Sequence, residues 1–223
     1  MLEVTHLQAT APRGASLPNT FLRSAEDADT LALLFPGRGY RSTAPLLHYT
    51  QRLFLERGID VLRLDLAYDL DPDFRRAASE EQRAWIREDA LTAFAAGREQ
   101  RQYRRVVLVG KSLGTWAVSD ILHLRPAPPA PACVWLTPLL HDRALVDSVR
   151  QLRPPSLFVI GTADLLYDPQ LLGELGDLPG CRSLVVPDAD HGLEVRGDME
   201  ATLRAMGSYL EALGEFIEVA SGS

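Results

Sequence analysis

The chain of 223 residues is long enough for one α/β domain with a sizeable core, and no linker-like segment divides it. Its composition, 46% hydrophobic and 24% charged, is that of an ordinary globular protein. The formal net charge of −7 disfavours nucleic acid and anionic membrane surfaces as partners, because both attract proteins through clusters of positive charge. We therefore expect a single domain over residues 1–223 with neither kind of partner, and the sequence leaves the oligomeric state open.

Two features of the sequence predict a cytoplasmic location. The N-terminal residues lack a basic region followed by an apolar stretch, so no signal peptide is visible. No apolar run approaches the roughly 18 residues that a bilayer-spanning helix needs. The two cysteines, Cys133 and Cys181, each lie in an apolar run, so we expect small core residues and no disulfide framework.

Short apolar runs alternate with longer segments of helical period, which predicts strands and helices alternating around a mostly parallel sheet. The expected strands are Leu31–Phe35, Ile59–Leu64, Val106–Val109, Cys133–Leu136, Leu157–Ile160 and Ser183–Val186, with two antiparallel edge strands within Leu2–Arg23. The expected helices are Pro45–Arg57, one that begins at Ser79, Leu113–Leu124, Arg143–Leu152 and a last one from Met199 to Ile217. The segment 67–78 is expected to be a polar loop, and the proline-rich Pro126–Pro131 a stiff surface connection outside the sheet.

In the last helix, apolar residues spaced alternately by four and three are expected to pack on the sheet. These residues are Met199, Leu203, Met206, Leu210, Leu213 and Ile217.

The segment Gly110-Lys111-Ser112-Leu113-Gly114 stands directly between an expected strand and an expected helix. A serine at the apex of such a tight turn adopts a strained backbone, and its hydroxyl is lifted clear of the sheet. Residues two before and two after the serine then crowd each other, which explains glycine at both places. The following helix also directs its N-terminal N–H groups at the same point. Ser112 is the candidate nucleophile.

A serine hydroxyl needs a base, since almost none of it is ionised at neutral pH. Of the five histidines, His6 lies in an expected edge strand, and His48 and His123 lie in expected helices. His191 instead follows the last strand and precedes the last helix, which places it at the same edge of the sheet as Ser112. Gly192 lets the chain turn beside the imidazole. His191 is therefore the candidate base.

The base in turn needs a carboxylate that fixes its tautomer. Asp164 comes just beyond a strand end and lies between nucleophile and base in chain order, so it is the preferred acid. Asp142, after an earlier strand, is the main rival. Asp168 precedes a proline and is better explained as a helix N-cap, and Asp190 is too near His191 in sequence to orient its ring.

An acyl-transfer site also needs donors for the negative oxygen that forms during attack. The backbone N–H of Leu113, next after the candidate nucleophile, is one candidate. The loop that follows the Leu31–Phe35 strand should supply the other, since its two glycines allow a close backbone approach. Arg38 is the preferred second donor and Gly37 the next choice.

At this point the sequence resembles the α/β-hydrolase superfamily, from about Leu31 to the end. The segment around Ser112 resembles the nucleophile elbow, and Asp164 and His191 follow in the family's order. The resemblance implies a twisted, mostly parallel sheet of about eight strands with helices on both faces and the site at the strands' carboxyl edge. It also implies activity as an esterase, thioesterase, lipase or peptidase.

Two departures from the superfamily pattern matter. Only about 20 residues separate the strand ending near Leu136 from the next one, which leaves no room for a large cap, so we expect an open site unsuited to a lipase that acts at interfaces. The loop Pro36-Gly37-Arg38-Gly39 differs from the histidine-glycine form of many lipases and esterases. Serine at the elbow argues against dehalogenase or epoxide hydrolase chemistry, which uses aspartate there.

The sequence therefore predicts a serine hydrolase that cleaves small acyl esters or thioesters through an acyl-serine intermediate. Arg38, Lys111 and His141 lie near the expected site, which favours a small or anionic acyl substrate. No cofactor or metal is expected, because no histidine or cysteine cluster has ligand spacing. The alternatives are a small serine peptidase, an acyltransferase on the same residues, or a hydrolase-fold binding protein without turnover.

Overall fold

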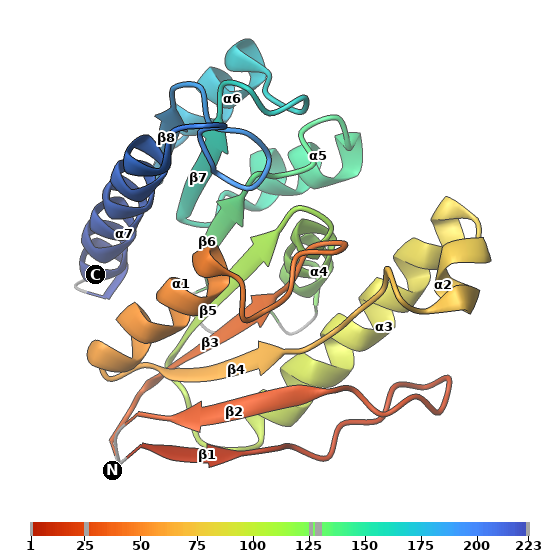
Figure 1. Ribbon diagram of the computed structural model, residues 1–223. Helices are drawn as coiled ribbons and strands as arrows, with labels where there is room; N and C mark the ends of the chain where they lie inside the picture. Colours follow the sequence, from red (N-terminus) through yellow and green to blue (C-terminus); the bar gives the residue numbers. More distant parts are fainter. Residues whose placement is uncertain (1, 25–26, 125–126, 128–130, 222–223) are drawn as a thin grey trace.

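The computed structural model describes residues 2–24, 27–124, 127 and 131–221. One eight-stranded sheet runs through it in the order β1-β2-β4-β3-β5-β6-β7-β8 (Figure 1). The strands are β1 (Glu3–Thr5), β2 (Asn19–Arg23), β3 (Thr30–Phe35), β4 (Asp60–Leu64), β5 (Arg105–Lys111), β6 (Pro131–Leu136), β7 (Ser156–Gly161) and β8 (Cys181–Val186). The helices are α1 (Pro45–Glu56), α2 (Pro72–Arg76), α3 (Ser79–Arg98), α4 (Gly114–Leu122), α5 (Arg143–Leu152), α6 (Pro169–Gly176) and α7 (Met199–Ser221).

The sheet is parallel except at one edge. All pairings among β4, β3, β5, β6, β7 and β8 are parallel, whereas β2 pairs antiparallel with both β1 and β4. The carboxyl ends of the six parallel strands therefore meet at one edge, where the following loops gather. The predicted sheet, its antiparallel edge strands and its lack of a large cap are confirmed, since only α5 and short turns stand between β6 and β7.

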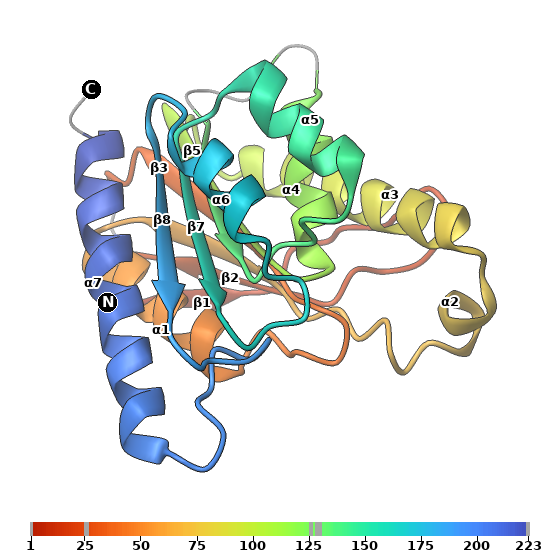
Figure 2. The same cartoon turned by 90° about the horizontal axis from the view of Figure 1, so that it is seen from above.

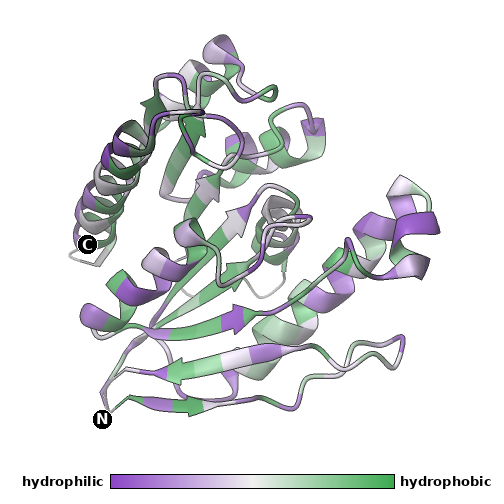
Figure 3. Ribbon diagram, viewed as in Figure 1, coloured by the Kyte–Doolittle hydropathy of each residue, from purple (hydrophilic) through white to green (hydrophobic). Residues whose placement is uncertain are grey.

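Helices cover both faces of the sheet (Figure 2). Helices α3, α4, α5 and α6 pack with one buried cluster, and α1 and α7 pack with the other. Strand β3 is apolar from Leu31 onward because both of its faces are buried: Leu31 and Leu33 belong to the first cluster, and Ala32 and Leu34 to the second. Hydrophobic residues accordingly follow the central strands, while α2 is largely hydrophilic (Figure 3). Burial on both faces is what a parallel sheet requires.

Helix α2 is an element that the sequence analysis did not predict. It lies in the segment expected to be a polar loop, and its first turn is capped by Asp71, whose carboxylate accepts from the N–H groups of Asp73 and Phe74. Phe74 is fully buried and stacks on Tyr68 with 4.5 Å between ring centroids. This short helix is held by one buried aromatic side chain. A single apolar residue produces no helical periodicity in the sequence, so the helix could not be predicted.

The expected packing face of α7 was partly wrong. Met199 and Leu203 are 71% and 65% exposed, because the first turns of the helix extend past the sheet. Leu213 and Ile217 are buried as expected, and Tyr209 and Phe216, which were not expected, are buried with them. Among the described residues, no helix is long and apolar enough to cross a membrane.

Pro131 was also misplaced, because it is the first residue of the central strand β6, a position at which a missing N–H is tolerated. The rest of the Pro126–Pro131 connection, apart from Ala127, lies outside the described residues.

Candidate active site

The turn between β5 and α4 presents Ser112 at the carboxyl edge of the sheet. Ser112 has a φ of 51°, in the left-handed region that a serine seldom adopts. Its N–H donates to the carbonyl of Leu136 on β6 at 2.9 Å, and its own carbonyl accepts from the N–H and the hydroxyl of Thr115. The strained residue is thus held by the neighbouring strand and by the first turn of the helix.

Two glycines make this turn possible because neighbouring backbone leaves no space for a side chain. A Cβ on Gly110 would lie 2.6 Å from the carbonyl oxygen of Gly114. A Cβ on Gly114 would lie 2.3 Å from the carbonyl oxygen of Phe35, at the end of β3. Gly110 is therefore crowded by Gly114, as the sequence predicts. Gly114 is crowded by the end of β3, which the sequence did not predict.

His191 and Asp164 complete a hydrogen-bonded chain with Ser112. The Nε2 of His191 lies 2.8 Å from the Oγ of Ser112, and its Nδ1 lies 2.8 Å from the Oδ2 of Asp164. In the tautomer with hydrogen on Nδ1, the ring donates to the carboxylate and Nε2 is free to accept the serine hydrogen. The structure therefore brings together the three residues that the sequence singled out, from loops after β5, β7 and β8.

The side chains of Asp164 and His191 differ in exposure. The side chain of Asp164 is 1% exposed, whereas that of His191 is 43% exposed. Burial raises the pKa of Asp164, but hydrogen bonds from His191 and from the N–H of Leu166, together with the charges of His191 and Lys111, outweigh it and hold the pKa below its usual value. Asp164 is therefore a buried, ionised acceptor, as a histidine-orienting acid must be.

The loops that carry Asp164 and His191 are joined directly by hydrogen bonds. The N–H of Ala163 donates to the carbonyl of Ala189 at 3.0 Å, and the hydroxyl of Thr162 accepts from the N–H of Asp188 at 2.8 Å. The sequence analysis did not identify these contacts. Gly161, the last residue of β7, was the one sign of them in the sequence. The reason for a glycine there, the close approach of Ala189 after β8, is visible only in the folded chain.

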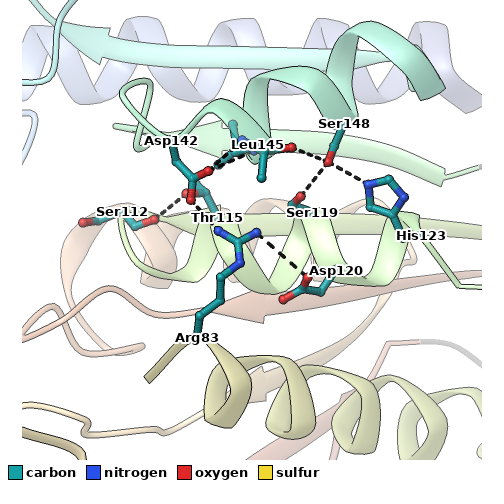
Figure 4. A network of polar contacts seen from close by, with 10 residues as sticks. Arg83, Ser112, Thr115, Ser119, Asp120, His123, Asp142, Leu145 and Ser148 are labelled. Carbon is teal, nitrogen blue, oxygen red and sulfur yellow. Dashed lines mark hydrogen bonds and ion pairs between the residues drawn. The ribbon is translucent and has the colours of Figure 1, made fainter. Parts of the chain in front are cut away.

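The rival acids have other partners. Asp142 accepts from the N–H groups of Ala144 and Leu145 and so caps α5, and it forms an ion pair with Arg83 of α3 (Figure 4). Asp168 caps α6 through the N–H of Leu171, as expected. Asp190 accepts from the N–H groups of its own loop. Among the described residues, Asp164 is the carboxylate that meets the imidazole.

The candidate oxyanion donors lie around the elbow. Leu113 follows Ser112 at the start of α4. Gly37 is buried and close to the serine, since a Cβ there would lie 3.2 Å from the Cβ of Ser112. Arg38, the next residue, is exposed. The choice of Arg38 over Gly37 as the second donor stays a prediction.

Of the three basic residues expected near the site, only two face solvent. Arg38 and His141 are exposed, whereas Lys111 is 1% exposed. Lys111 is therefore unavailable to a substrate at the surface, and the expectation that it contributes to an anionic binding site there was wrong. The alternation of β5 is the reason: Lys111 points to the same face as Val107 and Val109, which α1 and α7 cover.

An open cavity of about 400 Å³ adjoins His191 and Asp164, and Arg196 and the fully exposed Leu165 form part of its wall. A second cavity of about 680 Å³, between the start of α1 and the start of α7, shares Asp190 and Arg196 with it. Within the described ranges, no group of three or more histidine, cysteine, aspartate or glutamate side chains is arranged to hold a metal ion.

The strand order, the antiparallel β2 and a strand-to-helix elbow at the carboxyl edge are those of the α/β hydrolases. The family model described as an alpha/beta hydrolase domain matches residues 28–218. The chain belongs to this family.

Solved structures with the same fold share little sequence with this chain. An esterase from Pyrococcus furiosus superposes with a TM-score of 0.74 at 12% identity, over 97% of this chain and 92% of its own. A serine hydrolase without a lid from Xanthomonas campestris gives 0.70 at 18% identity, over 97% and 94%. Est1E from Butyrivibrio proteoclasticus, solved with ferulic acid bound, gives 0.73 at 14% identity, over 98% and 100%. No curated protein sequence matches this chain significantly.

Proposed function

We propose that this α/β hydrolase is a serine hydrolase that cleaves carboxylic esters or thioesters of small acyl substrates. The observation that carries the proposal is the chain Ser112–His191–Asp164, with 2.8 Å at each hydrogen bond. Two proteins of the same fold support this class: the esterase from Pyrococcus furiosus and the serine hydrolase without a lid from Xanthomonas campestris. A cytoplasmic location stays a prediction from the sequence.

In the first step the Oγ of Ser112 forms a bond to the acyl carbon while its proton moves to the Nε2 of His191. The negative charge that develops on the carbonyl oxygen is stabilised by the backbone N–H groups of Leu113 and of Arg38 or Gly37. The tetrahedral intermediate then collapses, the bond to the leaving alcohol or thiol breaks, and His191 returns the proton to it. Asp164 keeps the imidazole in the correct tautomer and stabilises its charged form.

In the second step, water takes the place of the leaving group. His191 removes a proton from the water as it attacks the acyl carbon. The bond from the acyl carbon to the Oγ of Ser112 then breaks while His191 passes the proton to that oxygen, which releases the carboxylic acid and restores the serine hydroxyl. Water can reach this intermediate because no large cap covers the site and the side chain of His191 is 43% exposed. This access favours hydrolysis over acyl transfer to a second substrate.

Fluorophosphonate labelling followed by peptide mapping tests the proposal. We expect a covalent adduct on Ser112 in the unmodified protein and none in Ser112→Ala or His191→Ala, with p-nitrophenyl acetate hydrolysis lost in parallel. Ser119, which is buried on α4 and contacts Ser148, provides the control, since Ser119→Ala should still be labelled. A folded protein that reacts with neither reagent is a hydrolase-fold binding protein, and cleavage of aminoacyl amides in preference to esters identifies a peptidase.

A further inference from the structure

Lys111 is the one lysine of the chain, since the other 22 of its 23 basic residues are arginines. It directly precedes Ser112 and is 1% exposed, so an ammonium group is buried beneath the candidate active site. Burial of a charge is unfavourable unless nearby groups stabilise it. The mechanism proposed above gives Lys111 no role, so its surroundings require an explanation.

The first partner of Lys111 is the ring of Tyr40. The Nζ lies 4.8 Å from the ring centroid, within the range of a cation–π interaction. Tyr40 closes the loop that follows β3, because its N–H donates to the carbonyl of Gly37 and its hydroxyl accepts from the N–H of Leu46 at 3.0 Å. The ammonium group therefore rests on the residue that holds the candidate oxyanion loop against α1.

The second set of partners is negative. The carboxylates of Asp164 and Asp190, in the loops after β7 and β8, both favour the charged form of Lys111. The reverse effect operates as well, since the charge of Lys111 helps to lower the pKa of Asp164. Glu194 is a further charged group near this pair, and its negative charge helps burial to raise the pKa of Tyr40. Burial outweighs the two carboxylates and lowers the pKa of Lys111 to about 8.

We propose that the ammonium of Lys111 is a positioning group that holds the oxyanion loop through Tyr40 and stabilises the ionised Asp164. This proposal rests on the serine hydrolase function proposed above. The ammonium group of Lys111 contacts neither the hydroxyl of Ser112 nor the imidazole of His191 in any described contact, so its effect is exerted through other residues. Loss of its proton would weaken both interactions at once, and activity would then fall as the pH rises past the pKa of Lys111.

Lysine differs from arginine in this respect, because a guanidinium keeps its proton throughout the working range of the enzyme. Lys111→Arg retains a cation that can stack on Tyr40, whereas Lys111→Met retains only the apolar stem. We expect Lys111→Met to lower kcat about tenfold with little change in KM, the loss of roughly 1.4 kcal/mol of positioning energy. We expect Lys111→Arg to recover most of kcat and to lack the alkaline decline.

The experiment combines p-nitrophenyl acetate kinetics from about pH 6 to about pH 10 with NMR of protein carrying ¹³Cε-lysine. Because the chain has one lysine, the spectrum contains one lysine signal, whose titration reports the pKa of Lys111 without any catalysis. We expect that pKa near 8 in the unmodified protein and clearly lower in Asp164→Asn. Asp168→Asn, which changes a carboxylate at the cap of α6, should leave it unchanged and is the matched control.

Three results would overturn the proposal. One is a folded Lys111→Met protein with unaltered kcat and pH profile, and another is a lysine signal that titrates near the ordinary value and ignores Asp164→Asn. If Lys111→Met does not fold, the pH profile of Lys111→Arg decides, since an alkaline decline that persists there is not due to Lys111. Failure of the proposed function is a separate outcome: Ser112 then stays unlabelled in the unmodified protein, while the lysine titration still tests the link to Asp164.

Discussion

Gly161 and Ala189 press the ends of β7 and β8 together so closely that a Cβ on Gly161 would lie 1.9 Å from the carbonyl oxygen of Ala189. The contact stands three residues before Asp164 and two before His191 along their respective loops. Together with the hydrogen bond from the N–H of Ala163 to the same carbonyl, it fixes the separation of Asp164 and His191. The geometry of the candidate site thus depends on backbone packing as well as on the three side chains.

Gly161→Ala should accordingly damage both stability and activity. A displaced backbone in a packed region costs about 3 kcal/mol of unfolding free energy, and a misplaced imidazole lowers kcat as well. Urea unfolding and p-nitrophenyl acetate hydrolysis measure the two effects. Gly173→Ala is the control, since nothing lies within 4 Å of its Cβ position in α6, and it should gain about 0.5–1 kcal/mol. Equal stability of the two variants would contradict the role given to the contact.

Asp164 and Asp142 should separate catalysis from stability. Asp164→Asn is expected to lower kcat by about 10³- to 10⁴-fold, because an amide stabilises neither the tautomer nor the charged imidazole. Asp142→Ala should keep kcat within about threefold but lose about 1–3 kcal/mol of stability, since it removes the cap of α5 and leaves Arg83 without that carboxylate. Steady-state kinetics and urea unfolding of both variants test this. A loss of kcat in Asp142→Ala as large as that in Asp164→Asn would contradict the assignment of Asp164, and not Asp142, as the residue that orients His191.

Lys111 should make stability increase with pH above neutrality. Its pKa is lowered to about 8 in the folded protein from 10.5, so the unfolded chain binds more protons between these values. The free energy of unfolding should therefore rise by roughly 2 kcal/mol between about pH 7 and about pH 9.5 relative to Lys111→Met. Urea titrations of both proteins at the two pH values measure the difference. A constant difference between them would show that Lys111 titrates normally.

The cavity beside His191 should bind the part of the substrate that carries charge. Arg196 lines it and, within the part of the chain that the structure describes, forms no ion pair. Arg196→Gln is expected to raise KM about fivefold for p-nitrophenyl esters of dicarboxylic acids and to leave KM for p-nitrophenyl acetate unchanged, because an exposed pair contributes up to about 1 kcal/mol. Arg204, exposed and paired with Glu200 on α7, is the control for Arg→Gln. Equal effects on both esters would remove Arg196 from substrate binding.

The sequence determined the fold class and the three residues of the candidate site. Buried strands in a parallel sheet are apolar at every position, so they stand out from amphipathic helices and fix the alternation of the chain. Ser112 was recognisable because its turn requires glycine at fixed distances. Asp164 and His191 followed because parallel strands bring their carboxyl ends to one edge, so residues after separate strands can meet.

The tertiary structure alone decided what surrounds these residues. Lys111 could be read as a surface cation until the packing of α1 and α7 showed it buried against Tyr40. Likewise the sequence could not distinguish Asp142 as a cap from Asp142 as an acid, since both roles place a carboxylate just after a strand. These assignments depend on contacts between segments far apart in the chain, and such contacts leave no periodic or local pattern in the sequence.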